Sequence, residues 1–217
     1  MPGPTNAQRG REVRARLLEA ARDLIAEVGW SGVSTRVLAE RAGVRYGLVH
    51  YHFESVQALL RQATLEAMGG MLDGTATLLA DAASPADGVE AMLTELDRYD
   101  GSDPASLLFI EGYLAATRDP ELRERMSDLM ASFRTSLTTC LAEAGHPSPD
   151  GAARLVMAVF DGFVLHKGLD PELSGSRIAP LLRVLTSTAP AEPAEPAAKP
   201  IAVAKPTESA EPNGARR

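Results

Sequence analysis

Residues 44–55 read VRYGLVHYHFES and place two histidines and two tyrosines within twelve positions. Imidazole and phenol groups can ligate metals, transfer protons or make hydrogen bonds to polar partners such as phosphate groups. The segment is too short and too polar to be a helix of the protein core. These side chains are therefore expected to contact a partner outside the chain.

A metal site is the first alternative, because His50, His52 and Glu54 alternate along this segment. On a helix, residues two positions apart point about 200° away from each other, so these three cannot share one ion. Cys140 is the only cysteine, which excludes an intrachain disulfide and a thiolate metal cluster. The sequence thus predicts neither a metal centre nor another cofactor.

An enzyme is the second alternative. His146 precedes a proline, and His166 adjoins Lys167 near an expected helix end, where it would either touch a ligand or interact with the helix dipole. No glycine-rich phosphate loop, carboxylate pair or nucleophile motif accompanies these histidines. Catalysis is therefore not the expected function of this chain.

The stretch VSTRVLAERAGVRYGLVHYHF, residues 33–53, predicts two short helices joined by a turn. Ser34 or Thr35 is suited to cap the first helix, and Gly43 supplies the positive φ that a tight turn requires. The buried positions expected around this turn are Val37, Leu38, Ala42 and Val44. With a longer helix before it, this arrangement is a helix-turn-helix, whose second helix enters the major groove of DNA.

The sequence from Arg11 to Leu60 resembles the DNA-binding domain of the TetR (tetracycline repressor) family. The matching elements are LLEAARDLIAEVGWSGVSTRVLAERAGVRYGLVHYHF followed by ALL. The resemblance implies an all-α fold, with a three-helix helix-turn-helix DNA-binding domain on a larger helical ligand-binding and dimerisation domain. It also implies a homodimer that binds a pseudo-palindromic operator in double-stranded DNA and responds to a small-molecule effector, most often as a repressor. A helix-turn-helix that makes only protein contacts is the remaining alternative.

By this resemblance, Thr35 and Arg36 contact phosphates at the N-terminus of the first motif helix. Arg45 can donate to guanine in a bidentate fashion, and Leu48 can pack on a thymine methyl group. Packing within the domain is the alternative role for Tyr51. The full set of expected DNA contacts is Thr35, Arg36, Arg45, Tyr46, Gly47, Leu48, His50, Tyr51 and His52.

Other positions of this segment have structural roles or depart from the family pattern. Val49 and Phe53 fall on the side of the second helix away from DNA and are expected in the core. Val56 stands where family members usually carry a phosphate-binding lysine, which predicts weaker non-specific binding and a flatter salt dependence. An N-terminal arm that ends in Arg9 and Arg11 is expected to reach further phosphates or the minor groove.

Charge and composition divide the chain into regions. Residues 1–62 contain nine arginines and six acidic residues, a net charge of +3, so the chain total of −7 leaves −10 for the rest. The last 29 residues hold six of the fifteen prolines and no aromatic residue, a composition typical of disorder. We expect a flexible arm, a helix-turn-helix domain, a helical effector-binding and dimerisation domain and a disordered tail at residues 1–8, 9–54, 55–188 and 189–217.

No apolar run approaches the roughly 18 residues that a membrane span needs, and the first residues, MPGPTNAQRGRE, lack the apolar stretch of a secretory signal. The expected compartment is the cytoplasm. Four Ser-Pro or Asp-Pro pairs, which begin at Ser84, Asp103, Asp119 and Ser148, are typical of helix starts. Helices are expected at residues 10–29, 34–41, 45–52, 55–79, 85–99, 104–117, 120–143, 149–167 and 176–188. Gly145 and Gly168 are suited to left-handed helix ends.

The helices expected at 120–143 and 149–167 carry apolar stripes wider than one buried face requires. By the family resemblance, they pair with their counterparts in a second subunit. Methionines and aromatic residues between the DNA-binding domain and these helices are candidates for an effector pocket, with ordinary core packing as the alternative. They are Met68, Met71, Met92, Leu96, Tyr99, Phe109, Tyr113, Met126 and Phe163. Gly69 and Gly70 are a possible bend in the helix that joins the two domains.

Overall fold

The computed structural model describes residues 5–187, and in this range the chain is helical, without strands. The helices are α1 (Asn6–Val28), α2 (Thr35–Arg41), α3 (Tyr46–His52), α4 (Val56–Ala80), α5 (Pro85–Leu96), α6 (Pro104–Ala116), α7 (Pro120–Glu143), α8 (Pro149–Lys167) and α9 (Gly175–Thr186), with a short 3-10 helix, η1 (Trp30–Gly32), after α1. The all-α fold is confirmed. Of the helices in this range, none has the length and apolar character needed to cross a membrane. The expected tail, 189–217, lies outside the described residues.

All four predicted proline pairs start a helix, and at three of them the residue before the proline caps the helix with its side chain. The side chains of Ser84, Asp103 and Asp119 accept hydrogen bonds from backbone N–H groups in the first turns of α5, α6 and α7. Ser148 does not cap α8 with its side chain. Instead, its backbone N–H donates to Nδ1 of His146 (3.1 Å), so the tight turn before the helix is closed by the imidazole.

The glycines confirm two of the predicted turns and correct a third. Gly43 and Gly145 have φ values of +63° and +80°, in the left-handed region that lacks a Cβ penalty for glycine. Gly168 has φ of −72°, so its prediction as a left-handed helix end is wrong. The backbones of Gly168 and Gly101 pack closely instead: a Cβ on Gly168 would lie 3.2 Å from the backbone O of Gly101, and one on Gly101 would lie 2.2 Å from the backbone N of Gly168.

Helix α1 begins earlier than expected. A reciprocal capping box forms between Thr5 and Gln8, in which the threonine Oγ1 accepts from the Gln8 N–H (3.2 Å) and the Gln8 Oε1 accepts from the Thr5 N–H (2.7 Å). Residues 6–8 are therefore helical, and Arg9 and Arg11 lie on α1 instead of on a flexible arm.

The head, which we define as α1 to α3, packs on the first turns of α4. Val49 and Phe53 lie in its core, as predicted, with 0% and 6% of their surface exposed. The prediction for α2 is partly wrong: Val37 is 36% exposed, and Ala39 is buried in its place. A helix of two turns offers too few apolar positions to fix which face is buried.

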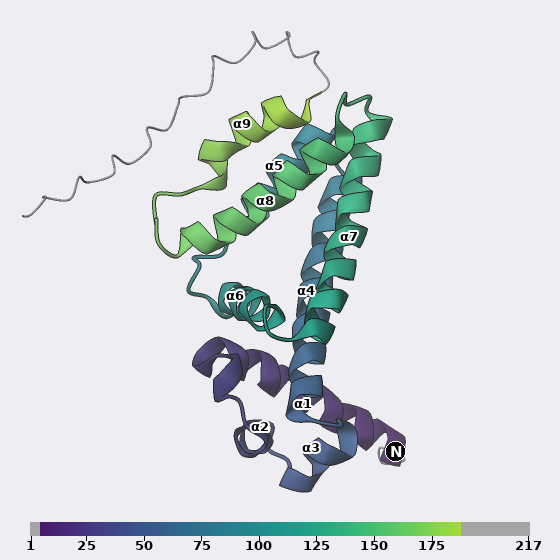
Figure 1. The fold of residues 1–217 in the computed structure, drawn as a ribbon, viewed down its shortest axis with the longest axis vertical. Coiled ribbons are helices and arrows are strands. Elements are labelled where there is room, and N and C mark those ends of the chain that lie inside the picture. Colours follow the sequence, from purple (N-terminus) through teal and green to yellow (C-terminus); the bar gives the residue numbers. More distant parts are fainter. Residues whose placement is uncertain (1–4, 188–217) are drawn as a thin grey trace, which may run out of the picture.

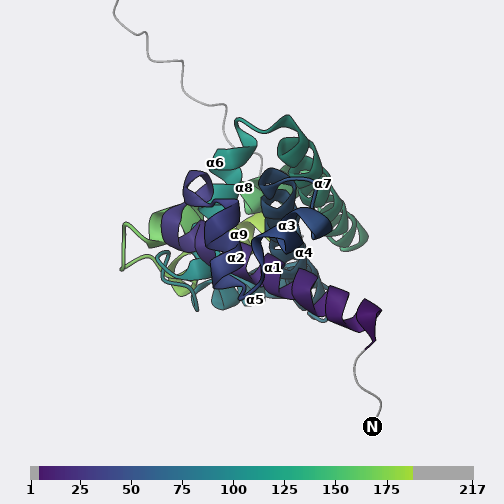
Figure 2. The same cartoon turned by 90° about the horizontal axis from the view of Figure 1, so that it is seen from below.

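The body consists of the remaining helices, and α4 connects it to the head (Figure 1). Helix α4 runs from the head alongside α7, while α6 lies between the head and α8 (Figure 1). Helices α5, α8 and α9 form the end far from the head, where α5 packs on α9. Viewed from the head end, α1, α2 and α3 lie in front of the body helices (Figure 2). The helix-turn-helix thus occupies one end of an elongated molecule.

Candidate DNA-binding face and body cavity

Helix α3 presents one buried residue, and most of its remaining side chains face solvent. Val49 fixes the helix to the head core, whereas Tyr46 and Tyr51 are 57% and 79% exposed. Exposure of this size shows that Tyr51 is not a core residue. Of the other expected DNA contacts, Arg36, Arg45, Gly47 and His50 are exposed, and Thr35, Leu48 and His52 are half-buried.

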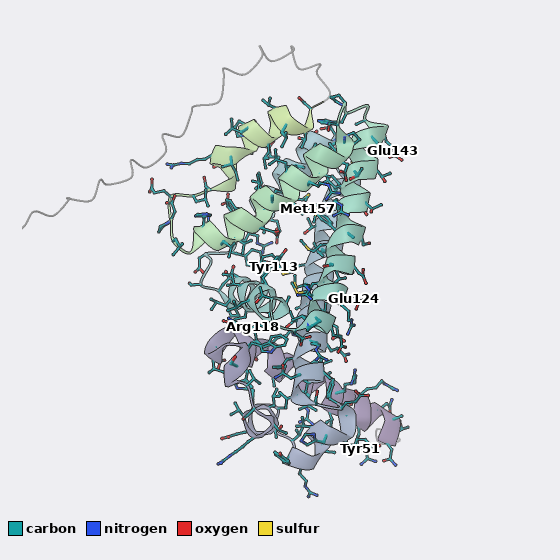
Figure 3. The ribbon with its side chains drawn as sticks, viewed as in Figure 1. Tyr51, Tyr113, Arg118, Glu124, Glu143 and Met157 are labelled. Atoms are coloured by element: carbon teal, nitrogen blue, oxygen red, sulfur yellow. The ribbon has the colours of Figure 1, made fainter. Side chains whose placement is uncertain are left out.

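Aromatic rings pair along the exposed face of α3. The rings of Tyr46 and His50 meet edge to face with centroids 5.6 Å apart, and those of Tyr51 and His52 do so at 5.0 Å. Such pairs restrict the side chains without burying them. The face thus carries four polar ring side chains that contact one another in pairs. Figure 3 shows Tyr51 at the end of the head away from the body.

Arg14 on α1, which the sequence analysis did not single out, fixes the end of α3. Its Nη1 donates to the backbone O of His52 (3.2 Å), and its Nη2 donates to Oε1 of Gln62 on α4 (2.5 Å). The guanidinium also lies over the Phe53 ring, 4.3 Å from the centroid. The sequence did contain a sign of this role: Arg14 follows Val13 on the apolar side of α1, and a half-buried arginine requires hydrogen-bond partners.

Helix α2 is anchored separately. Ser34 caps it by accepting from the N–H of Val37 (3.4 Å). Near its other end, Arg41 makes two hydrogen bonds to Glu27 of α1, and these bonds lower the pKa of the Glu27 carboxyl group. Ser34 thus occupies the N–H of Val37, and the N–H groups of Thr35 and Arg36 are those of this turn that can face an anion.

A cavity of about 580 Å³ lies in the body between α4, α5, α6, α7 and α8. Six of the predicted effector-pocket residues line it: Met68, Met71, Met92, Leu96, Tyr99 and Phe109. Most of the other lining residues were not predicted from the sequence. They are Ala67, Gly70, Leu72, Gly74, Thr75, Leu78, Glu95, Met130, Phe133, Met157, Phe160, Asp161 and Val164.

Tyr113, Met126 and Phe163 do not line this cavity, which corrects the predicted set. Met126 is buried in the packing between α4, α6 and the start of α7. Phe163 is also buried, with the Lys167 ammonium 5.2 Å from its ring centroid. Tyr113 lies behind the cavity wall and donates its hydroxyl to Oδ2 of Asp161 (3.1 Å).

Asp161 is an acid in a mostly apolar cavity wall. It is half-buried, and burial raises the pKa of its carboxyl group, an effect that the hydrogen bond from Tyr113 partly opposes. Burial also raises the pKa of the Tyr113 hydroxyl, and the negative charge of Asp161 adds to this shift. In the sequence, Asp161 could have been recognised as a buried acid because it lies within the apolar run VFDGFV. Figure 3 shows Tyr113 and Met157 in the interior of the body, between its helices.

Polar contacts join the head to the body around the first turns of α4. The backbone N–H of Trp30 donates to Oε2 of Glu111 on α6 (2.8 Å), and its indole Nε1 donates to Oε1 of Gln57 on α4 (2.8 Å). Arg61 on α4 makes ion pairs with Asp119 (2.7 Å) and Glu121 (2.5 Å) at the start of α7. The head is therefore tied to α4 and α6, and α4 is tied to the start of α7; all three helices also border the cavity.

The sequence of the head matches the family profile described as "Bacterial regulatory proteins, tetR family" over residues 17–63. Residues 80–188 match the profile "Tetracyclin repressor-like, C-terminal domain". The chain belongs to the TetR family. It is thus a helix-turn-helix transcriptional regulator, and the resemblance drawn from the head alone is confirmed.

Relatives of this TetR-family regulator cover most of its length. The HTH-type transcriptional regulator Rv2912c of Mycobacterium tuberculosis is 29% identical over 191 residues, which are 84% of this chain and 97% of the relative. The HTH-type transcriptional repressor Rv3405c of the same organism is 34% identical over 61% of this chain and 67% of its own length. A solved regulator, SCO7518 of Streptomyces coelicolor A3(2), is 31% identical with a TM-score of 0.65, and the match covers 82% of this chain and 99% of that one.

These relatives are transcriptional regulators and not enzymes. The two histidines considered for catalysis, His146 and His166, have other positions and contacts in the fold. Nε2 of His146 lies 2.8 Å from the backbone O of Leu185, so this histidine connects the turn before α8 to the end of α9. His166 is exposed in the last turn of α8, where a cation interacts favourably with the helix dipole.

Proposed function

We propose that this TetR-family regulator is a homodimeric repressor that leaves its operator when a small molecule occupies the body cavity. Residues 9–54 would contact DNA, and residues 55–188 would bind the effector and form the dimer. The first support is the exposed face of α3. Arg45 and Tyr46 lie at its solvent-exposed start, where a helix in the major groove meets base edges.

The assigned DNA contacts divide into two kinds. Arg45 and Leu48 would meet base edges, because a guanidinium recognises guanine and an apolar group recognises the thymine methyl. Thr35 and Arg36, in the first turn of α2, would bind phosphates, which positions the head without reading sequence. Tyr46, Gly47, His50, Tyr51 and His52 complete the proposed interface.

The main support for a ligand response is that α4 is one continuous helix that reaches from the head to the cavity. This single helix, Val56–Ala80, contributes Leu59 and Leu60 to the head core, and its residues Gly70, Met71 and Gly74 line the cavity. A ligand that shifts the cavity part of α4 must therefore also shift the support of α3. Its differential affinity for the two positions sets the largest loss of DNA binding that it can cause.

The proposed dimer surface is a seam of small and apolar side chains along α8. Leu155 and Leu165 are 48% and 50% exposed, and a Cβ added to Gly162 would meet no atom within 4 Å. Together with Gly151 and Ala158 they are spaced by four, three, four and three residues, the pattern of a helix seam that packs on a partner helix. The exposed side of the neighbouring α7 carries small residues at the same spacing: Ser132, Thr135, Thr139 and Ala142.

The dimer can be tested by mass measurement in solution. Replacing Leu155 and Leu165 together with glutamate places four charges in the proposed interface of each dimer, which should yield monomers by light scattering and abolish operator binding. Leu181→Glu on α9 is the matched control, because Leu181 is 73% exposed but lies off the seam. The proposal fails if the unaltered chain is monomeric at micromolar concentration, or if only the control dissociates.

The ligand response has its own test. A library of small molecules is screened for compounds that raise the melting temperature of the full chain, and each hit is then added to the protein–operator complex. Stabilising compounds should release DNA, whereas Met71→Trp, which fills part of the cavity, should reduce both effects. Compounds that bind in the cavity and leave operator affinity unchanged would contradict the proposed mechanism.

A further inference from the structure

The charges in the cavity wall are all of one sign. Glu95 and Asp161 line it, whereas within residues 5–187 no lysine, arginine or histidine does. A ligand with a carboxylate or phosphate group would enter this wall without a counter-charge and against two acids. An anionic effector is therefore disfavoured on electrostatic grounds.

Asp161 is the acid that most needs a partner. Among the hydrogen bonds of residues 5–187, its carboxylate accepts one, from the neutral hydroxyl of Tyr113 (3.1 Å). Two other half-buried acids of the body have cationic partners: Asp97 pairs with Lys167 (2.8 Å) and Asp119 pairs with Arg61 (2.7 Å). Burying a carboxylate in an apolar wall costs desolvation free energy unless a nearby cation offsets it. Asp161 therefore offers a negative charge that a bound cation can neutralise.

Glu95 adds a second, weaker negative charge. Its side chain is 45% exposed and lies 3.1 Å from Arg98, whose side chain is 73% exposed. An ion pair with that much solvent contact contributes little and is easily exchanged for another cation. Glu95 can therefore support a cationic ligand, but Asp161 is expected to dominate.

The rest of the wall suits an apolar cation. Aromatic rings attract cations at their faces, and methionine side chains adapt to ligands of irregular shape. The rings are those of Tyr99, Phe109, Phe133 and Phe160, and the methionines are Met68, Met71, Met92, Met130 and Met157. The volume of about 580 Å³ is in the range of pockets that hold drug-sized molecules.

We propose that the cavity binds lipophilic organic cations of drug size, with their positive charge against Asp161. The inference rests on the function proposed above, since it names the chemical class of the effector. It goes further in assigning one residue, Asp161, to the recognition of charge and the aromatic and methionine wall to the recognition of apolar surface.

Two ions of equal shape and opposite charge test the proposal: tetraphenylphosphonium and tetraphenylborate. Calorimetric titration of the full chain should show that the phosphonium binds at least about tenfold more tightly, equivalent to about 1.4 kcal/mol. Asp161→Asn, which keeps an acceptor for Tyr113, should weaken phosphonium binding about tenfold and leave borate binding unchanged or tighter. Glu95→Gln should give a smaller loss. Glu124→Gln, which removes a charge on exposed α7 surface, is the matched control and should change neither affinity.

The outcomes separate the ligand class from the regulatory function. Equal affinity for both ions, tighter borate binding, or binding of neither ion overturns the inference, as does an Asp161→Asn variant that binds the phosphonium like the parent. If the phosphonium binds with the expected dependence on Asp161 but does not release the operator, the inference stands and the proposed repressor mechanism fails. If uncharged or anionic compounds release the operator by binding in the cavity, the mechanism stands and the inference fails.

Discussion

Arg14→Ala should loosen α3 without removing any group that faces DNA. The variant loses the hydrogen bonds to His52 O (3.2 Å) and to Gln62 (2.5 Å) and the stacking on the Phe53 ring. Hydrogen bonds that involve a charged group contribute roughly 1.5–3 kcal/mol each, and a solvent-accessible cation–π contact contributes about 0.5–1 kcal/mol. Because Arg14 is only half-buried, solvent screening reduces this sum, and we expect a loss of about 2 kcal/mol in total.

The assays are thermal unfolding and operator titration. A loss of about 2 kcal/mol corresponds to a decrease of about 4–8 °C in the melting temperature of a chain of this size. Operator affinity should also decrease, and it should decrease more for the preferred sequence than for random DNA, because base contacts need a fixed α3. Arg14→Lys, which keeps the charge but not the planar fork, should lie between the parent and the alanine variant.

The control for this experiment is Arg16→Ala. Arg16 lies on the same helix, is exposed, and makes no hydrogen bond or ion pair within the part of the chain that the structure describes. It therefore reports the effect of removing one positive charge near DNA. If Arg14→Ala and Arg16→Ala give the same melting temperature and the same ratio of specific to non-specific affinity, the positioning role of Arg14 is refuted.

Three further predictions concern DNA binding and its control. Arg36→Ala should weaken binding to all sequences and reduce the salt slope by about one, whereas Arg45→Ala should weaken mainly the preferred sequence by about 1–3 kcal/mol; equal effects in gel-shift titrations would contradict the assigned roles. Val56→Lys, which restores a charge usual in the family, should raise affinity for all DNA and steepen the salt slope by about one, and an unchanged slope would contradict a phosphate contact there. Replacing Gly69 and Gly70 with alanine should alter the response to a cavity ligand more than the DNA affinity of the free protein; equal changes in both titrations would count against a role for this part of α4 as the lever.

The glycine pair has room for that substitution. A Cβ on Gly69 would meet Leu129 at 4.0 Å, and one on Gly70 would meet no atom within 4 Å. Helix α4 continues without interruption through both residues. Alanine there stiffens the helix by up to about 1 kcal/mol per residue without creating a clash. Because Gly70 also lines the cavity, an altered ligand response is assigned to the mechanics of α4 only if Gly69→Ala alone, off the lining, produces it.

The helices were predictable because their ends are encoded locally. Proline after serine or aspartate, and glycine at positive φ, placed most helix ends within a few residues of those observed. The start of α1 was missed because the capping box of Thr5 and Gln8 lies in a polar segment without an apolar periodicity to mark it. Val37 was wrongly predicted to be buried because the apolar residues of a helix as short as α2 fit more than one buried face.

The cavity was predictable only in part, because a void is a property of the packed chain. Met68 and Met126 are both methionines and both largely buried, but only the first borders the empty volume. Asp161 and Tyr113 are 48 residues apart in the sequence, so no local spacing predicts their contact. The exposed side of α3 was easier to predict, because the one core position of this short helix, Val49, fixes the direction of its other side chains.

The central claim is that two copies of α3 enter successive major grooves of one operator. Methylation protection measures this directly, because dimethyl sulfate attacks guanine N7 in the major groove. On an operator selected from random DNA, the full chain should protect two guanine-containing stretches about 10–10.5 base pairs apart or a multiple of this, and Arg45→Ala should expose the guanines in both. Unprotected major-groove guanines on a bound operator, or a single protected stretch, would contradict the account.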